Sequence, residues 1–76
     1  MFAMRYKMIG LKIAYYRKMR GYTQGQLAGK IGISSTYLGQ IERGNNGKSY
    51  SLETLLSIAV GLDIDVNLLL SSSENI

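Results

Sequence analysis

The sequence predicts an all-α protein built from five helices. Apolar residues recur at helical spacing in successive segments, and Ser, Thr, Asp and Gly stand where helix caps are expected. No segment gives a convincing strand signal, and proline is absent. A chain of 76 residues supports one small core, so we expect a single domain.

The first helix is expected from Ile9 to Arg20. Ile9, Ile13 and Tyr16 form its apolar stripe, and Gly21 should end it in a left-handed conformation. This pattern is typical of an amphipathic helix. The basic side chains that fall largely off the stripe are Lys12, Arg17, Lys18 and Arg20.

The second and third helices are predicted from their caps. Thr23, followed three residues later by Gln26, is a capping box, so the second helix should start there and run to Gly32. Gly32 is the least costly residue for a positive φ, and Ser34 can then cap the third helix, which Gly44 closes. Two short helices joined by a tight turn follow from these signals.

The fourth and fifth helices come after a polar loop over residues 45–50. Ser51 caps the fourth helix, and Glu53 in its first turn interacts favourably with the helix dipole. Asp65 should cap a short last helix over residues 66–70. The buried stripe expected on the fourth helix consists of Leu52, Leu55, Leu56, Ala59 and Leu62.

Two loose segments are expected outside the helical domain. We assign residues 1–8 to an N-terminal arm, residues 9–70 to the domain itself and residues 71–76 to a tail. Arg5 and Lys7 in the arm leave two alternatives open. A basic arm of this kind can insert into the minor groove of a nucleic acid, and a mobile basic segment that contacts nothing is the alternative.

The composition excludes several kinds of chemistry. With no Cys and no His, the chain has no thiol nucleophile, no imidazole base and no ordinary zinc ligands. Neither a metal nor a cofactor is expected, and an enzyme is the weakest functional hypothesis. The longest uncharged run near the C-terminus falls far short of the ~20 residues of a membrane span, so we expect a soluble protein of the cytoplasm.

Charge is distributed unevenly along the chain. Residues 1–50 hold all nine Lys and Arg and all six Tyr against one acid, Glu42, which gives a net charge of +8. Residues 51–76 hold four acids and no base, which gives −4. The basic half suits a polyanion, because Lys and Arg neutralise phosphates and Tyr hydroxyls donate to phosphate oxygens. An ordinary solvated basic face is the alternative.

The segment over residues 24–43, QGQLAGKIGISSTYLGQIER, predicts a helix-turn-helix. Gly32 makes the turn, and Ala28 is small where the two helices must cross closely. The outward face of the third helix has no carboxylate and carries side chains able to hydrogen-bond base edges. Its expected members are Ser35, Thr36, Gly39, Gln40 and Arg43. The positions expected to point inward are Leu27, Ala28, Ile31, Ile33, Leu38 and Ile41.

Three segments carry a resemblance: YTQGQLAGKIGISSTYLGQIERG, SLETLLSIAVGL and DIDVNLLL, in this order and spacing. With them, the 62 residues from Ile9 to Leu70 resemble the phage-repressor and Cro-type helix-turn-helix family. The resemblance implies a five-helix, lambda-repressor-like DNA-binding domain. It also implies a transcriptional regulator of the bacterial and phage type that binds operator DNA as a homodimer.

The resemblance assigns roles to residues around the turn. Gln24 is expected to hold a backbone phosphate and to brace the third helix. The positions where the family contacts bases are occupied by Ser35, Thr36, Gln40 and Arg43, the last of which also suits a phosphate. The family's phosphate contacts fall at or near Gln24, Lys30, Tyr37, Asn46 and Lys48.

Arg17 and Glu42 match a family ion pair between the first and third helices. The charge pattern favours the same pair, because Glu42 is the only acid in the basic half and stands on a helix meant to approach phosphate. An unpaired carboxylate there would repel DNA. Two unrelated surface charges are the alternative.

The last helix has more apolar residues than one buried stripe of so short a helix can use. Some of them must be exposed in a monomer, and exposed apolar surface on a small domain usually marks an interface. We therefore expect a homodimer formed through Val66, Leu68 and Leu70. Exposure without an interface is the alternative.

Two functional hypotheses of different classes follow. The first is a sequence-specific regulator of transcription that binds a near-palindromic operator as a homodimer. It is a repressor, because nothing in the sequence resembles an activation or ligand-sensing domain. The second is a protein-interaction module, such as an antitoxin-like partner of a toxin, in which DNA binding is secondary or lost. The uncharged-to-basic face of the third helix favours the first hypothesis.

Overall fold

Five helices joined by short loops make up the computed structural model, which describes residues 2–45 and 48–71. Within those ranges no residue lies in a strand. The all-α prediction is therefore confirmed. The helices are α1 (Ala3–Met19), α2 (Gln24–Ile31), α3 (Ser35–Glu42), α4 (Leu52–Leu62) and α5 (Asn67–Leu70).

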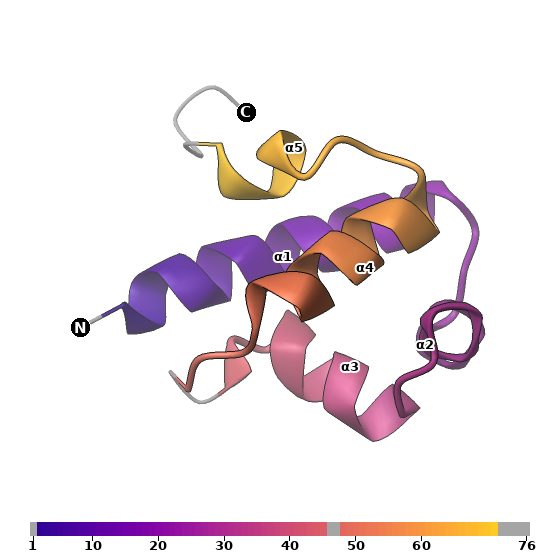
Figure 1. Cartoon of the computed structure of the whole chain (residues 1–76), viewed down its shortest axis with the longest axis horizontal. Coiled ribbons are helices and arrows are strands. Elements are labelled where there is room, and N and C mark those ends of the chain that lie inside the picture. Colours follow the sequence, from indigo (N-terminus) through magenta and orange to yellow (C-terminus); the bar gives the residue numbers. More distant parts are fainter. Residues whose placement is uncertain (1, 46–47, 72–76) are drawn as a thin grey trace.

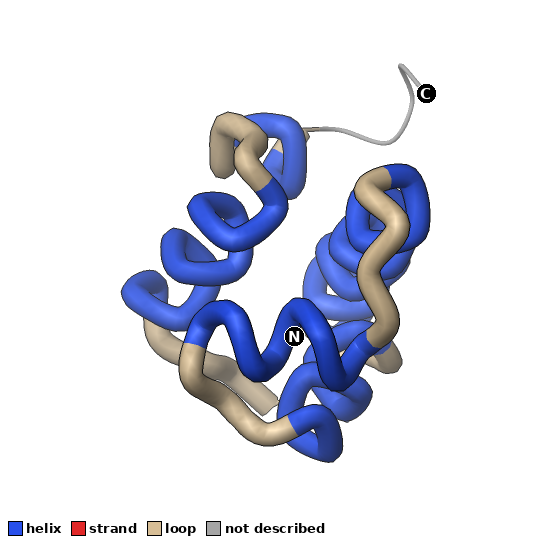
Figure 2. The backbone as a smooth tube through the Cα atoms, turned by 90° about the vertical axis from the view of Figure 1, so that its right-hand side faces the viewer, coloured by secondary structure: helices blue, strands red, loops and turns tan. Residues whose placement is uncertain are grey.

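Helix α1 is the scaffold of the fold, because it packs against α3, α4 and α5. Helix α2 packs against α3 and α4. Figure 1 shows α3 and α5 on opposite sides of α1 and α4. Figure 2 gives the same arrangement from the side, with every described element a helix or a loop. In the described part of the chain, no helix is both long and apolar enough to cross a bilayer.

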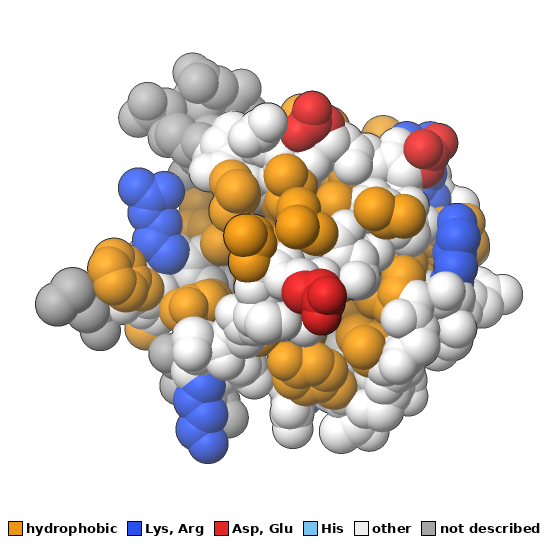
Figure 3. Space-filling view, in the orientation of Figure 1, with side chains coloured by type: hydrophobic (Ala, Val, Ile, Leu, Met, Phe, Trp, Pro, Cys, Tyr) orange, Lys and Arg blue, Asp and Glu red, His pale blue; other side chains and the backbone are white. Residues whose placement is uncertain are grey.

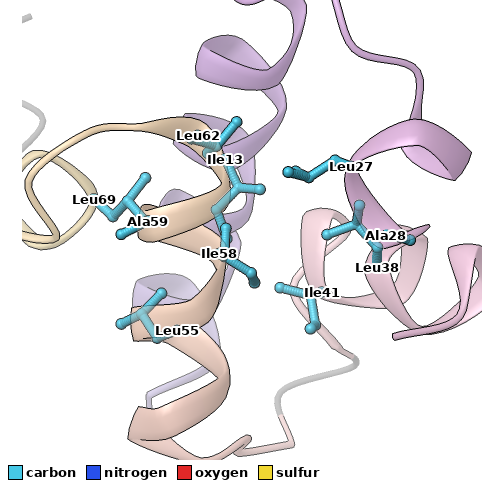
Figure 4. Close-up of a cluster of buried hydrophobic side chains, with 10 residues drawn as sticks. All are labelled: Ile13, Leu27, Ala28, Leu38, Ile41, Leu55, Ile58, Ala59, Leu62 and Leu69. Carbon is cyan, nitrogen blue, oxygen red and sulfur yellow. The ribbon is translucent and has the colours of Figure 1, made fainter. Parts of the chain in front are cut away.

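The core lies where all five helices meet, and Figure 4 shows its side chains pointing toward one another. Ile13 of α1, Ile58 of α4 and Ile41 of α3 are fully buried and join the two halves of the molecule. Burying one such side chain contributes roughly 1.5–3 kcal/mol. The core comprises Ile13, Leu27, Ala28, Leu38, Ile41, Leu55, Ile58, Ala59, Leu62 and Leu69.

The caps that the sequence predicts are present. Thr23 and Gln26 form a reciprocal capping box at the start of α2, and the hydroxyls of Ser34 and Ser51 accept the capping hydrogen bonds of α3 and α4. Gly32 turns the chain between α2 and α3 with a φ of 80°. The helix-turn-helix prediction is thereby confirmed in its local geometry.

Helix α1 begins earlier than expected. The prediction of a loose arm up to residue 8 is wrong for residues 3–8, which are helical. Neither Gly nor Pro interrupts this segment, and the Tyr6 ring packs edge-on against Tyr50, with centroids 5.3 Å apart. Arg5 and Lys7 therefore belong to a helix, so neither a minor-groove arm nor a mobile basic segment, the two alternatives left open by the sequence, describes them.

Tyr50 closes the N-terminal side of the core beside α1. Its hydroxyl is buried and has no hydrogen-bond partner among the described residues. Burial raises the pKa of Tyr50 to about 12, and the neighbouring Tyr6 and Tyr37 phenols add to the shift. The fold thus favours the neutral phenol at this position.

Two bases of α1 that lie off its apolar stripe are nevertheless buried, Lys12 and Arg17. The Lys12 ammonium donates hydrogen bonds to the carbonyl oxygen and the hydroxyl of Ser71, directly after α5. Arg17 is held by α3. The stripe pattern missed both residues, because each is buried through a polar contact with another helix.

Helix α4 buries a different face from the one expected. Leu52 and Leu56 are 65% and 42% exposed, so their assignment to the buried stripe is wrong, whereas Ile58 is fully buried. Seven of the eleven residues of α4 are Leu, Ile, Ala or Val, and they fall on several faces, so the pattern alone does not determine which face is buried. Gly61 does so, because a Cβ there would lie 2.5 Å from Cγ2 of Ile31, and only glycine allows this approach of α4 to α2.

Helix α5 begins at Asn67, one residue later than expected. The N-cap is therefore Val66 and not the expected Asp65, but the Asp65 carboxylate, one residue earlier, still accepts a hydrogen bond of 2.8 Å from the Asn67 amide. Leu69 is buried and fixes the helix to the core. The tail predicted over residues 71–76 lies outside the described residues beyond Ser71.

Candidate nucleic-acid interface

The exposed face of α3 is polar and carries no free acid. Ser35, Thr36, Gln40 and Arg43 are all exposed, as expected from the helical period. The opposite face is anchored in the core by Leu38 and Ile41. These four side chains therefore form the outer surface of the helix-turn-helix and are accessible to a binding partner.

The single acid of α3, Glu42, is buried and neutralised. The Nε of Arg17 donates to Glu42 Oε2 at 2.7 Å, and Nη2 donates to Oε1 at 3.1 Å. A third guanidinium nitrogen, Nη1, donates to the carbonyl oxygen of Tyr22 at 2.9 Å. The predicted ion pair is present in a bidentate geometry, which is the strongest form for Arg and carboxylate.

Gln24, the first residue of α2, completes this network. Its Nε2 donates to Glu42 Oε1 at 3.1 Å, so the expected bracing of the third helix by Gln24 is present. Three elements now meet at one carboxylate: α1 through Arg17, α2 through Gln24 and α3 through Glu42. The network fixes the orientation of α3 against both neighbours.

Gly39 departs from the expected outward face, because it is buried. A Cβ at this position would lie 3.3 Å from Oε1 of Gln24 and 3.3 Å from Nη1 of Arg43. Both side chains thus lie over Gly39. The expectation of an exposed glycine is wrong, and the residue instead provides the space through which Gln24 reaches α3.

The expected phosphate-contacting residues occupy different environments. Tyr37 is half-buried and packs against the core, while Lys48 is exposed in the loop after α3. The side chain of Asn45 donates to the Lys48 carbonyl oxygen at 2.9 Å and closes this loop. Asn46 lies outside the described residues.

Lys30 is turned toward α4 instead of the α3 face. Its ammonium donates to the Gly61 carbonyl oxygen at 2.9 Å and to the Tyr22 hydroxyl at 2.8 Å. Gly61 lies in the last turn of α4, where carbonyl oxygens lack helical partners and a cation is favourable. The structure thus gives Lys30 a role at the end of α4, which departs from the expected phosphate contact.

Gly10 was not predicted from the sequence to belong to this region. A Cβ there would lie 2.5 Å from the carbonyl oxygens of both Ile41 and Glu42. Helix α1 therefore touches the backbone of α3 directly. The available signal was a glycine in a helix, seven residues from Arg17 and so on the same face.

An apolar surface lies on the side of the molecule opposite α3. Leu68 and Leu70 of α5 are each 43% exposed, and Val66 is half-buried. Figure 3 shows hydrophobic side chains gathered over α4 and α5. The excess of apolar residues predicted for the last helix is thus exposed in the single chain.

Comparison with known proteins identifies related domains. A family model described as helix-turn-helix matches residues 13–69. The HTH-type transcriptional regulator SinR of Bacillus subtilis (strain 168) is 41% identical over 67 residues, which cover 88% of this chain and 60% of SinR. The chain thus spans about 60% of the length of this curated relative.

Solved structures give the same result. The restriction-modification controller protein C.AhdI from Aeromonas hydrophila matches with a TM-score of 0.82 and 29% identity, over 90% of this chain and 96% of that one. A crystal structure of SinR, a master regulator for biofilm formation, in complex with DNA matches with a TM-score of 0.76 and 41% identity. This match covers 84% of the present chain and 100% of the SinR chain.

Proposed function

Because this chain belongs to the helix-turn-helix family, we propose that it is a transcriptional regulator that binds duplex DNA through α3. The observation that carries the proposal is the exposed face of α3, which is polar and basic while its one carboxylate, Glu42, is buried and paired. The major groove of B-DNA is ~12 Å wide and admits an α-helix, so α3 fits it. The role is one of binding rather than catalysis.

Base contacts are proposed for Ser35, Thr36 and Gln40 of α3 and for Arg43, the residue that directly follows it. The Gln40 amide can donate to and accept from one adenine edge, and the Arg43 guanidinium can donate twice to a guanine. Ser35 and Thr36 at the start of the helix supply hydroxyls for either base type. These side chains would determine which operator is bound.

Backbone contacts are proposed for residues that flank α3. Gln24, Tyr37 and Lys48, with Asn46 from the same loop as Lys48, would hold phosphates and fix the register of α3 in the groove. The bond from Gln24 to Glu42 supports this role, because it orients the Gln24 amide before DNA arrives. Lys30 is left out, since α4 and Tyr22 hold its ammonium.

The functional unit is proposed to be a homodimer that acts as a repressor in the cytoplasm. The exposed Leu68 and Leu70, together with Val66, supply an apolar surface on α5 that a second copy would cover. A two-fold dimer implies a near-palindromic operator with half-site centres about one helical turn apart, ~34 Å. Repression follows if the bound dimer occupies a promoter.

Selection of bound sequences from a random duplex pool tests the DNA-binding proposal. We expect an inverted repeat, and affinity that falls with log salt at a slope of about −0.9 per phosphate neutralised, with ~4–6 phosphates per subunit. Recovery of no sequence, together with no affinity for any duplex, would overturn it. The protein-interaction hypothesis, which the exposed apolar surface of α5 also supports, would then replace it.

Two substitutions separate base contacts from backbone contacts. Gln40→Ala should cost ~1–3 kcal/mol on the selected operator and flatten the preference at one base pair per half-site. Lys48→Ala should weaken binding to all sequences alike and reduce the salt slope by about one. An unchanged preference profile for Gln40→Ala would refute its base contact.

The dimer is tested by sedimentation and by operator affinity on the same samples. Replacement of Leu68 and Leu70 with Ser should weaken self-association and DNA binding together. Val60→Ser is the control, because Val60 is 77% exposed on α4 and borders a surface hollow lined by residues of α2 and α4. A Leu68 and Leu70 variant that sediments as a monomer yet keeps full operator affinity would refute the dimer.

A further inference from the structure

We propose that Lys7, on the second turn of α1, is an additional contact to the DNA phosphate backbone beside the C-terminal end of α3. The inference rests on the proposed function, and it assigns a binding role to the segment that precedes Ile9. It differs from insertion of an arm into the minor groove, because Lys7 is part of a continuous helix.

The position of Lys7 is fixed by its contact with the turn after α3. Gly44, with a φ of 94°, closes α3, and a Cβ on Gly44 would lie 3.2 Å from Cα and 3.4 Å from Cβ of Lys7. The backbone of Lys7 therefore packs on the residue that follows Arg43. The side chain of Lys7 itself is exposed.

The rest of α1 holds this contact in place. Lys7, Gly10 and Arg17 lie on one face of the helix, three and seven residues apart. Gly10 touches the backbone of Ile41 and Glu42, and Arg17 pairs with Glu42. One face of α1 thus follows the C-terminal half of α3 as far as Gly44, and Lys7 stands at its end.

The position of Lys7 beside α3 places it near DNA phosphates when α3 lies in the major groove. When α3 occupies a major groove of ~12 Å, the elements that flank α3 lie over the phosphates at the rims of the groove. The loop that carries Lys48 is one such element, and Lys7 lies against the start of that loop. Figure 3 shows basic side chains projecting at the edge where Figure 1 places the first turns of α1 and this loop.

The charge environment of Lys7 also suits a phosphate. Among the described residues, its ammonium has no ion-pair or hydrogen-bond partner, whereas Lys12 and Lys30 donate to carbonyl oxygens. The nearest acid along the adjoining α3 is Glu42, which Arg17 already neutralises. Because α1 is preformed, a phosphate contact would order only the Lys7 side chain.

Arg5 provides a matched control two residues away. It borders two surface hollows shared with Ile9 and Leu70, on the side of α1 that faces α5. Arg5→Gln and Lys7→Gln therefore remove the same charge from the same two turns of helix, on different faces. Lys7→Arg keeps the charge and should restore binding.

Fluorescence anisotropy of the full chain with the selected operator and with a random duplex, from 50 to 200 mM salt, tests the proposal. One phosphate contact accounts for about a 3.5-fold change in affinity over this fourfold range of salt. The loss of affinity between 50 and 200 mM salt should therefore be about 3.5-fold smaller for Lys7→Gln than for wild type, and this should hold for both duplexes. Its base preference and melting temperature should stay unchanged, and Arg5→Gln should keep the wild-type slope.

The outcomes separate this inference from the proposed function. If wild type binds duplex DNA but Lys7→Gln keeps the wild-type slope, or Arg5→Gln matches Lys7→Gln, the Lys7 contact is refuted and the proposed function stands. If Lys7→Gln instead lowers the melting temperature and leaves the salt slope unchanged, Lys7 only stabilises the C-terminal end of α3, and the phosphate contact is refuted. If wild type binds no duplex, both proposals fall.

Discussion

Replacement of Gly10 by Ala tests how closely α1 and α3 must approach. The new Cβ would lie 2.5 Å from the carbonyl oxygens of Ile41 and Glu42 and 2.8 Å from the Glu42 carbonyl carbon. All three are backbone atoms of a helix, so none can rotate away as a side chain would. To restore an ordinary contact of about 3.4 Å, α1 and α3 must separate by roughly 0.9 Å at this point.

The expected cost follows from two opposing terms. Overpacking of a well-packed contact costs typically 1–3 kcal/mol, and the rigid backbone on the α3 side places Gly10→Ala at the upper end. Ala favours a helix interior over Gly by ~1 kcal/mol. Separation of the helices also stretches the Arg17–Glu42 pair on the same face. We expect a net loss of about 2 kcal/mol, or roughly 8–16 °C in melting temperature.

Gly29→Ala is the control for this substitution. Gly29 lies inside α2, and a Cβ there has no atom within 4 Å to meet. The substitution should therefore gain up to ~1 kcal/mol from helix propensity alone. Thermal and urea denaturation of wild type and both variants, followed by circular dichroism, measures the difference. A Gly10→Ala protein as stable as Gly29→Ala would refute the argument from close helix approach.

Three further substitutions test separate contacts. Glu42→Ala should cost a few kcal/mol of stability, up to roughly 3–5, because it leaves the Arg17 guanidinium buried without its partner; an unchanged urea midpoint would contradict this. For Tyr50, with its pKa raised to about 12, the folded state keeps a proton that the unfolded state loses near pH 10, so stability should fall between pH 10 and pH 12. The stability of Tyr50→Phe should fall less between pH 10 and pH 12. At pH 7 the variant should be at least as stable as wild type, because it removes a buried hydroxyl that lacks a partner among the described residues. Parallel plots of stability against pH for the two proteins would argue against the raised pKa of Tyr50. Gly39→Ala should keep or gain stability while operator affinity falls, because the methyl group displaces the flexible end of Gln24; lower stability with full affinity would exclude this role.

Helix caps and the turn were predictable because their interactions are local. A Ser or Thr side chain caps an amide two or three residues away, and a positive φ at Gly32 concerns one residue. The exposed face of α3 was predictable for a similar reason, since a period of 3.6 residues places Thr36 and Gln40 opposite the buried Leu38. These features need no knowledge of the rest of the chain.

The features that the sequence did not reveal depend on contacts between distant segments. The early start of α1 depends on packing between Tyr6 and Tyr50, which are 44 positions apart in the chain. The buried face of α4 depends on the approach of Gly61 to Ile31, and the burial of Gly39 depends on a side chain from α2. A helical pattern with apolar residues on several faces does not determine which of them is buried.

The orientation of α3 follows from how the fold accommodates a single carboxylate. A buried ion pair adds little net stability, because desolvation offsets most of its Coulombic gain. Glu42 nevertheless joins Arg17 of α1 and Gln24 of α2, so a rotation of α3 would break bonds to both neighbours at once. The bonds from Arg17 also neutralise the only acid on a helix proposed to approach phosphate. The network therefore serves the geometry and the charge of the proposed DNA-binding face together, and this explains why an acid is compatible with that position.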